Sequence, residues 1–228
     1  MMSDTPISVP RRSLLAAGAI LPFMALAGCA TTMGRYGLED GVRRLLELST
    51  QRAFARLTEP GGFYDDQITR IAVPDLGGSG SGAILGAILR TNAVRNRIAM
   101  ALNDVAVDLA DGAAPIVMDR VRSMSIADAV GVLRGGPTAA TDLLARDARG
   151  AVVEALLPGM TRALRSDLFE IMSAALSASS GSGLTAMADN VTDQIGTAIF
   201  RAIGREEAAI RADPRSTRDP VLIGLLGL

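Results

Sequence analysis

The sequence contains no histidine, no tryptophan and no lysine, so all 23 of its basic residues are arginine. Without histidine there is no Ser-His-Asp or Cys-His arrangement, and without lysine there is no Ser-Lys pair or Schiff base. Zinc, haem and iron–sulfur sites normally use histidine or cysteine ligands, and the chain has one cysteine. These absences exclude most nucleophilic and cofactor chemistry. We therefore expect no enzyme, no catalytic residue, no metal site and no cofactor.

The charges of the chain are nearly balanced, with 24 acidic residues and a net charge of −1. Nucleic-acid-binding proteins usually carry a basic surface, so we expect no nucleic-acid partner. Apolar residues make up 49% and charged residues 21% of the sequence, which is the balance of a folded protein. A length of 228 residues suits one domain, alone or with a leader.

Residues 1–28 are typical of a signal peptide. Arg11 and Arg12 form its positively charged start, and an uncharged, mostly apolar run follows from Leu14 to Gly28. This run is shorter than the about 20 apolar residues that a helix needs to span a bilayer. The arginine pair also resembles the twin-arginine export motif, although Pro10 stands where serine or threonine is usual. The sequence leaves both export routes open.

The apolar run ends in four residues that match the lipobox of bacterial lipoproteins, namely Leu26, Ala27, Gly28 and Cys29. This resemblance implies that Cys29 receives a diacylglyceryl group and becomes the first residue of the mature chain. Several acyl chains on one residue suffice for stable membrane anchoring. Ala30 follows instead of aspartate, which by the enteric sorting rule favours the outer membrane. We therefore predict a cell-envelope lipoprotein on the periplasmic face of the outer membrane, with residues 29–37 as a lipidated tether. The alternative is an ordinary signal peptide that contains a cysteine.

Residues 38–228 are predicted to form one all-α domain of about six to eight helices, because apolar residues recur at helical spacing along most of this range. Helices are expected over 38–57, 83–109, 115–123, 125–135, 137–157, 158–176 and 190–213. Pro115 and Pro158 are expected to separate neighbouring helices, because proline disrupts the helical hydrogen-bond ladder.

Three shorter stretches interrupt the helical pattern. Residues 68–73 alternate like a short strand, but Pro74 follows at once and would confine it to a sheet edge. Residues 77–82 and 177–183 are rich in glycine and serine, which predicts a flexible loop and a hinge. A phosphate-binding loop at the first of these would need a lysine that the chain lacks.

Two apolar stripes are expected to face the core. In the last long helix the stripe comprises Val191, Ile195, Ala198, Ile199, Ala202, Ile203 and Ile210. In the helix over 83–109 it comprises Val94, Ile98, Leu102, Val105 and Leu109. The apolar tail over 221–228 is predicted to dock on the domain's own core. Insertion into a partner groove or a membrane is the alternative.

One set of carboxylates shares a helical face, at Asp104, Asp108 and Asp111. Three such groups could hold a hard cation such as Ca²⁺. Their face lies away from the apolar stripe of the same helix, however, so we predict a solvated face rather than a metal site.

The other notable acids lie further along the chain. Glu206 is the best candidate for a buried ion pair with an arginine, whereas Glu207 and Arg211 have the spacing of an ordinary i,i+4 pair. Glu154 and Glu170 are acids that a glycan-cleaving enzyme could use, but nothing in the sequence positions them.

Four stretches carry a family resemblance, and in chain order they are Pro60–Phe63 with Arg70–Pro74, Pro115–Met124 with Asp128 and Ala129, Val132–Gly136 with Ala139–Thr141, and Ala198–Pro214. Together they resemble the bacterial envelope proteins known as the domain of unknown function 4197. The resemblance implies a mostly helical, exported domain and supplies no catalytic residues. The chain departs from the usual pattern in having no lysine and few aromatic residues.

Three functions are compatible with these observations. The preferred one is a non-enzymatic lipoprotein that acts as a helical interaction or scaffold module with an envelope protein partner. The first alternative is a helical binder of an apolar ligand such as a lipid, suggested by the aliphatic composition and ten methionines. The second alternative is a carboxylate-based, glycan-active enzyme.

Overall fold

The computed structural model describes residues 25–74, 91–166, 169 and 183–227, with side chains from Gly37 onward. Within these ranges it contains six α-helices, one 3₁₀ helix and no strand, which confirms the predicted all-α class. The elements are α1 (Ala25–Leu57), α3 (Asn92–Ser123), α4 (Ala129–Arg134), α5 (Ala139–Leu164), α7 (Gly183–Ala212), the 3₁₀ helix η2 (Pro214–Thr217) and α8 (Pro220–Leu226).

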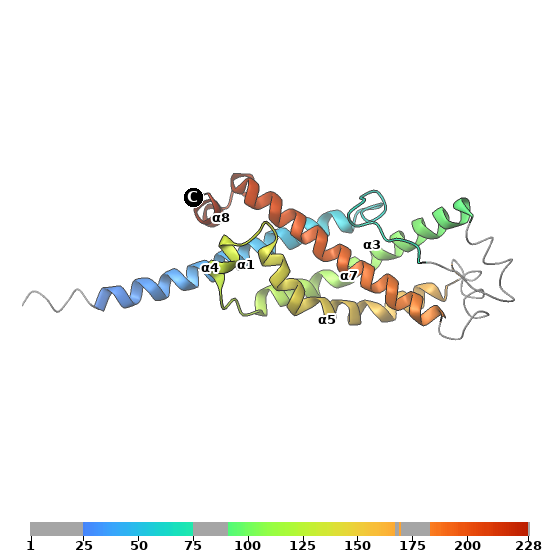
Figure 1. Ribbon diagram of the computed structural model, residues 1–228, viewed down its shortest axis with the longest axis horizontal. Helices are drawn as coiled ribbons and strands as arrows, with labels where there is room; N and C mark the ends of the chain where they lie inside the picture. The colour runs from blue at the N-terminus through green and yellow to red at the C-terminus, as the bar shows by residue number, and fades with distance from the viewer. Residues whose placement is uncertain (1–24, 75–90, 167–168, 170–182, 228) are drawn as a thin grey trace, which may run out of the picture.

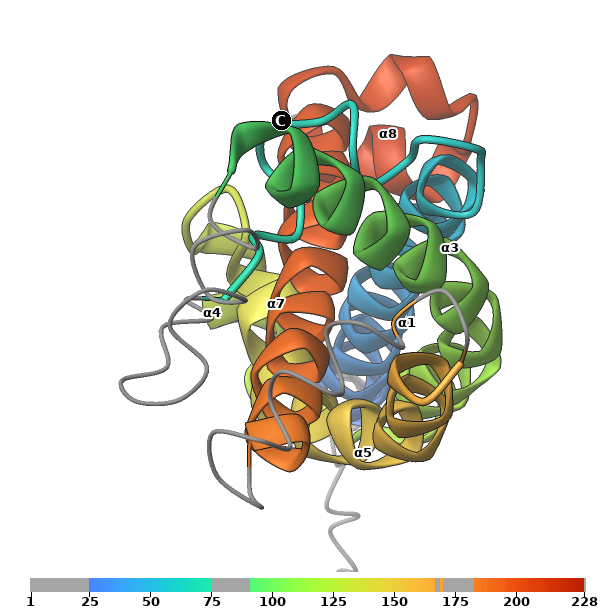
Figure 2. The ribbon, with the colours of Figure 1, turned by 90° about the vertical axis from the view of Figure 1, so that its right-hand side faces the viewer.

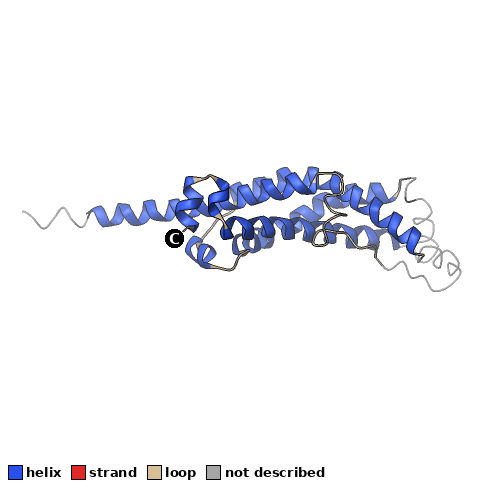
Figure 3. Ribbon diagram, turned by 90° about the horizontal axis from the view of Figure 1, so that it is seen from above, coloured by secondary structure: helices blue, strands red, loops and turns tan. Residues whose placement is uncertain are grey.

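The four long helices α1, α3, α5 and α7 run along one direction and form an elongated bundle (Figures 1 and 2). α7 packs against α5 and α1, and α3 packs against the same two helices, diagonally opposite α7. The short helices α4 and α8 lie at one end of the bundle, the end from which α1 projects (Figures 1 and 3).

α1 begins at Ala25, earlier than the predicted start at residue 38, so the segment expected to be a tether is helical. Within the bundle the helix buries one apolar face, comprising Val42, Leu45, Leu46, Ala53 and Leu57. These residues recur every three to four positions, as one face of a helix requires. This face packs against α3 and α7, while the first turns of α1 extend beyond the other helices (Figure 3).

The stripe predicted for the last long helix is confirmed, because all seven of its residues are buried in α7. In α3 the buried line instead follows Ile98, Leu102, Ala106, Ala110, Ala113, Val117 and Val121, and the predicted Val105 and Leu109 lie half-buried at its edge. α3 approaches α5 closely here: a Cβ atom on Gly159 would lie 2.5 Å from Cδ2 of Leu109. Small side chains such as Ala106 and Ala110 occupy the line because they let the helices come this close.

The helix breaks predicted at two prolines are wrong. Pro115 lies inside α3 and Pro158 lies inside α5, and both side chains are exposed. An internal proline removes a hydrogen bond and crowds the preceding turn. The turns around Pro115 are nevertheless held against the bundle by the buried Ala113 and Val117, so tertiary packing compensates for the local defect.

α4 and α7 also begin at residues other than those predicted. α4 begins at Ala129 rather than at residue 125, and Asp128 caps it, because Asp128 Oδ1 accepts a 2.8 Å hydrogen bond from the backbone N–H of Gly131. α7 begins at Gly183 rather than at residue 190. It ends at Ala212, as Pro214 predicts.

Residues 68–73, whose alternation resembles a short strand, form no strand. Side-chain amides pair with this backbone in place of a neighbouring strand. Asn103 of α3 accepts a hydrogen bond from the N–H of Ile71 (2.8 Å) and donates to its carbonyl (3.1 Å). Gln194 of α7 does the same for Ala72, at 2.8 and 3.2 Å. The two amides fix this segment to α3 and α7.

The predicted docking of the apolar tail on its own domain is confirmed. The tail forms α8, and Oδ1 of Asp219 caps its start by accepting from the N–H groups of Val221 (2.9 Å) and Leu222 (3.3 Å). Leu222 is fully buried. Leu225 packs on α1 so closely that a Cβ on Gly41 would lie 2.4 Å from its Cδ2.

Asn103→Ala should lower the free energy of unfolding by about 1–3 kcal/mol, because it leaves the N–H and carbonyl of the buried Ile71 without partners. Gln194→Ala is the matched control and should lower the free energy of unfolding by less, because water can reach the exposed Ala72 and replace the lost hydrogen bonds. Urea unfolding of both variants measures the difference. Equal effects of the two substitutions would contradict the assignment.

Candidate functional site

Glu207 of α7 is fully buried and holds the first turn of α5. Its carboxylate accepts hydrogen bonds from the N–H groups of Ala140 (3.0 Å) and Thr141 (2.7 Å) and from the Thr141 hydroxyl (2.6 Å). The first turn of a helix leaves such N–H groups unpaired and favours a negative charge. Glu207 therefore takes the place of an N-cap side chain, because Thr138, the N-cap residue of α5, makes no side-chain capping hydrogen bond.

Arg211 extends this arrangement to α4. Its Nε donates to Oε1 of Glu207 (2.8 Å), and its Nη1 and Nη2 donate to the carbonyl oxygens of Leu133 (3.0 Å) and Val132 (3.1 Å) at the end of α4. One guanidinium thus links the C-terminal end of α4 to the carboxylate that caps α5. We call the set formed by Glu207, Arg211 and their partners on α4 and α5 the Glu207 junction.

The predicted pairing of Glu207 with Arg211 is confirmed, but its surroundings differ from those of an ordinary surface pair. The exposed fraction of the Glu207 side chain is 0%, and that of Arg211 is 11%. The i,i+4 spacing reveals the pair and gives no information on the elements that cover it.

The buried ion pair predicted for Glu206 is also confirmed, with Arg56 Nη1 of α1 lying 3.2 Å from Oε1 of the buried carboxylate. The preceding residue, Arg205, forms an ion pair with Asp66 in the loop after α1. Its hydrogen bond holds the pKa of Asp66 below the ordinary value, outweighing the upward effect of burial. The N–H of Ile68 donates to the same carboxylate at 2.9 Å.

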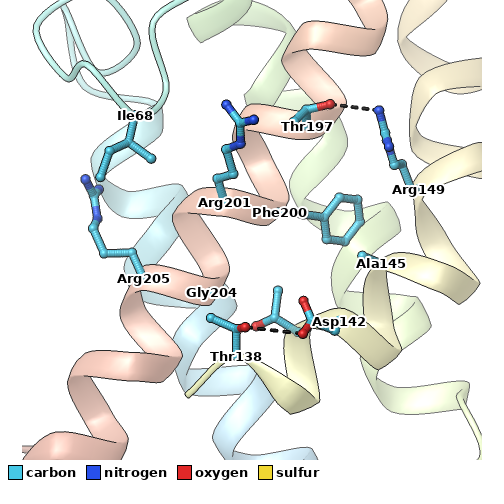
Figure 4. Close-up of a pocket in the computed structure, with 11 residues that line it drawn as sticks. Ile68, Thr138, Asp142, Ala145, Arg149, Thr197, Phe200, Arg201, Gly204 and Arg205 are labelled. Atoms are coloured by element: carbon cyan, nitrogen blue, oxygen red, sulfur yellow. Dashed lines mark hydrogen bonds between the residues drawn. The ribbon is translucent and has the colours of Figure 1, made fainter. Parts of the chain in front are cut away.

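An open pocket of about 380 Å³ lies between α5 and α7, beside the Glu207 junction (Figure 4). From α7, its walls include Thr197, Phe200, Arg201, Gly204 and Arg205. From α5 and the residue before it, they include Thr138, Thr141, Asp142, Ala145 and Arg149. Ile68 contributes from the loop after α1. We call this the arginine pocket, because three of these residues are arginines.

The three arginines differ in how they are paired. Nη2 of Arg149 donates both to Asp193 Oδ1 (2.8 Å) and to Thr197 Oγ1 (2.7 Å), and so crosses from α5 to α7 (Figure 4 shows the second bond). Arg205 is paired as described above. Arg201 is exposed, and its side chain makes no ion pair or hydrogen bond with any residue in the described ranges.

The remaining walls of the arginine pocket are mostly apolar. Phe200 and Ala145 face each other from the two helices (Figure 4), and Ile68 is unusually exposed for its size, at 48%. Asp142 is the one acidic wall residue, and its Oδ2 accepts a 3.2 Å hydrogen bond from the Thr138 hydroxyl. The pocket therefore combines mostly apolar walls with one arginine, Arg201, that has no ion-pair partner among the described residues.

Two larger open hollows lie elsewhere on the bundle. One, of about 650 Å³, continues along α5 and α7 and shares Ala145 and Arg149 with the arginine pocket. The other, of about 530 Å³, lies between α1 and α3 near Pro115. Thr50 borders it as a buried residue whose hydroxyl has no hydrogen-bond partner among the described residues.

The acidic residues singled out in the sequence do not lie together in one site. Asp104, Asp108 and Asp111 are all exposed on α3, which confirms the predicted solvated face. Glu154 is exposed on the wall of the 650 Å³ hollow, and Glu170 lies outside the described residues. Over the described ranges, no three acidic or cysteine side chains are grouped so that they could hold a metal ion.

The lipobox residues Leu26, Ala27, Gly28 and Cys29 lie in the first turns of α1. Arg11 and Arg12 lie outside the described residues, as do residues 77–82 and 177–182. Among the helices that the structure describes, none combines the length and apolar character needed to cross a bilayer.

Sequence reasoning missed the arginine pocket. Its one sequence pattern was the i,i+4 spacing of Arg201 and Arg205, which is typical of any helix surface. Arg149 joins them only because α5 and α7 pack side by side, and no local pattern records that pairing.

Comparison with known protein families places the chain in a family of unknown function. The model of the family described as a protein of unknown function, DUF4197, matches residues 33–227. Searches of curated proteins and of solved structures found no match. Two of the stretches that carry the resemblance, Val132–Thr141 and Ala198–Pro214, meet at the Glu207 junction.

Glu207→Ala should lower the free energy of unfolding by about 3–5 kcal/mol, because it leaves Arg211 and the first turn of α5 without their buried counter-charge. Glu154→Ala, which removes an exposed carboxylate, is the control and should change stability by less than about 0.5 kcal/mol. Chemical denaturation measures both. A Glu207→Ala variant as stable as the control would refute a structural role for the junction.

The lowered pKa of Asp66 predicts an acid-dependent contribution to stability. A depressed folded-state pKa stabilises the fold above the unfolded pKa of about 4, and this contribution is lost as the pH falls through the folded value. The stability difference between wild type and Asp66→Asn should therefore be constant near neutral pH and shrink below about pH 4. Gln51→Ala, which alters an exposed residue of α1 without a titratable group, should show no such trend in the same denaturation series. A pH-independent difference for Asp66→Asn would contradict the prediction.

Proposed function

The chain belongs to the DUF4197 family, and within it we propose that this protein is a non-enzymatic, lipid-anchored helical module of the cell envelope. Its anchor is the acylated Cys29, and its location is the periplasmic face of the outer membrane. Its role is to present the helical bundle to an envelope partner at a fixed position relative to the lipid surface.

The continuity of α1 is the observation that best supports this proposal. The helix runs without interruption from Ala25 past Cys29 to Leu57, and its second half is buried in the bundle through residues such as Leu45 and Leu46. At about 1.5 Å per residue, the stretch from Cys29 to Leu38 corresponds to a rigid spacer of about 14 Å. An anchor at Cys29 would thus position the bundle mechanically as well as retain it.

Binding of an apolar ligand is the second candidate function, and the mostly apolar walls of the arginine pocket favour it. An enclosed aliphatic cavity would have made it the first choice, but the three described hollows are open to solvent. The glycan-active alternative has weaker support, because the described acids nominated for it contribute only Glu154, on the rim of a hollow.

Wild-type protein expressed with radiolabelled palmitate should carry the label and sediment with membranes. The Cys29→Ser variant, expressed and fractionated under the same conditions, should do neither. A Thr32→Ser variant, altered beyond the lipobox, should behave as the wild type. Absence of label from the wild type, or label retained by Cys29→Ser, would rule out the proposed anchor.

A further inference from the structure

We infer that the arginine pocket binds a small anionic amphiphile, a molecule with a phosphate or carboxylate head joined to an apolar body. This inference goes beyond the proposed function and does not depend on acylation of Cys29. It depends on three features of the pocket: its charge, its apolar walls and its size.

The unpaired arginine of the pocket wall favours an oxyanion as ligand. Of the three wall arginines, Arg149 and Arg205 are already paired with Asp193 and Asp66. Arg201 has no protein partner among the described residues, so its guanidinium is available to a ligand. A guanidinium has a planar fork of donors that matches carboxylate and phosphate oxygens two at a time.

Arg149 can assist Arg201 without losing its own contacts. Both of its side-chain hydrogen bonds, to Asp193 and Thr197, come from Nη2. A guanidinium carries five N–H donors, so Nε and Nη1 remain for a ligand. The bonds to α7 hold the Arg149 side chain across the groove and reduce the entropy that ligand binding would otherwise cost.

The apolar walls favour a ligand with an apolar body. Phe200 and Ala145 line the interior from opposite helices (Figure 4), and Ile68 leaves nearly half of its surface in water. A bare inorganic anion would not cover these side chains, whereas an alkyl group beside the anionic head would. Gly204 keeps α7 close to α5, since a Cβ there would lie 3.1 Å from Cγ2 of Thr138.

The size of the pocket fits a small molecule. Its volume of about 380 Å³ falls in the range of about 300–1,000 Å³ typical of small-molecule sites. The adjoining 650 Å³ hollow, which shares Ala145 and Arg149 with it, offers room for a longer apolar body along the same two helices.

Isothermal titration of the full-length chain carrying Cys29→Ser tests this inference apart from the anchor. The probes are octyl phosphate and octanoate, which combine the two features, and octanol and inorganic phosphate, which each have one. At least one of the two amphiphiles should bind at least about tenfold more tightly than octanol and inorganic phosphate, the amount expected for one charged hydrogen-bonded contact. Comparing the two amphiphiles identifies the preferred head.

Arg201→Gln in the same chain should weaken that binding by about tenfold or more. Arg162→Gln, which alters an exposed arginine of α5 outside the pocket, should leave it unchanged. Ala145→Trp fills the pocket while keeping its charges and should abolish binding, with circular dichroism verifying the fold. Equal binding of octanol or of inorganic phosphate, no binding of either amphiphile, or full affinity in Arg201→Gln would overturn the inference.

Discussion

Burial of the Glu207 carboxylate is the constraint on which the arrangement of α4, α5 and α7 depends. A charged group taken out of water costs several kcal/mol unless its oxygens are fully hydrogen-bonded. Here two backbone N–H groups, one hydroxyl and one guanidinium supply the bonds. These donors come from two helices, and the guanidinium also binds α4. Any shift of α5 along α7 would break several of these bonds at once, so the junction fixes the register of the helix pair. That register in turn places Arg149 opposite Thr197 and creates the arginine pocket.

The absence of lysine has a structural counterpart in how the arginines are used. Arg43 of α1 donates to carbonyl oxygens of Val121 (2.7 Å), Arg122 (2.7 Å) and Met124 (3.4 Å), at the end of α3. Arg211 serves the end of α4 in the same way. An ammonium group is a compact point charge, whereas the planar fork of a guanidinium can reach several acceptors at once. The bundle therefore uses arginine side chains to pair carbonyl groups at the C-terminal ends of α3 and α4.

The sequence predicts those parts of the fold that depend on a single helix. The stripe of α7 follows from its periodicity, because its seven apolar residues need only one buried face. Predictions from the sequence fail where a distant part of the chain determines the local structure. Pro115 remains in a helix because the residues around it are buried, and Ile71 forms no strand because Asn103 reaches it from α3. Glu207 shows the same limit at the site, since its partner Thr141 lies 66 positions earlier in the chain. The spacing of Glu207 and Arg211 shows that they pair, and only the packing of α5 shows that they are buried.

In the proposed anchored protein, the anchor and the arginine pocket are connected through one helix pair. The helix that carries Cys29 packs against α7, and α7 provides most of the arginines of the pocket. Glu206 strengthens this contact, because the residue beside Glu207 pairs with Arg56 of α1. Adjacent carboxylates of α7 thus bind two different neighbours: Glu206 binds the helix that leads to the membrane, and Glu207 binds the helix that forms the opposite wall of the pocket.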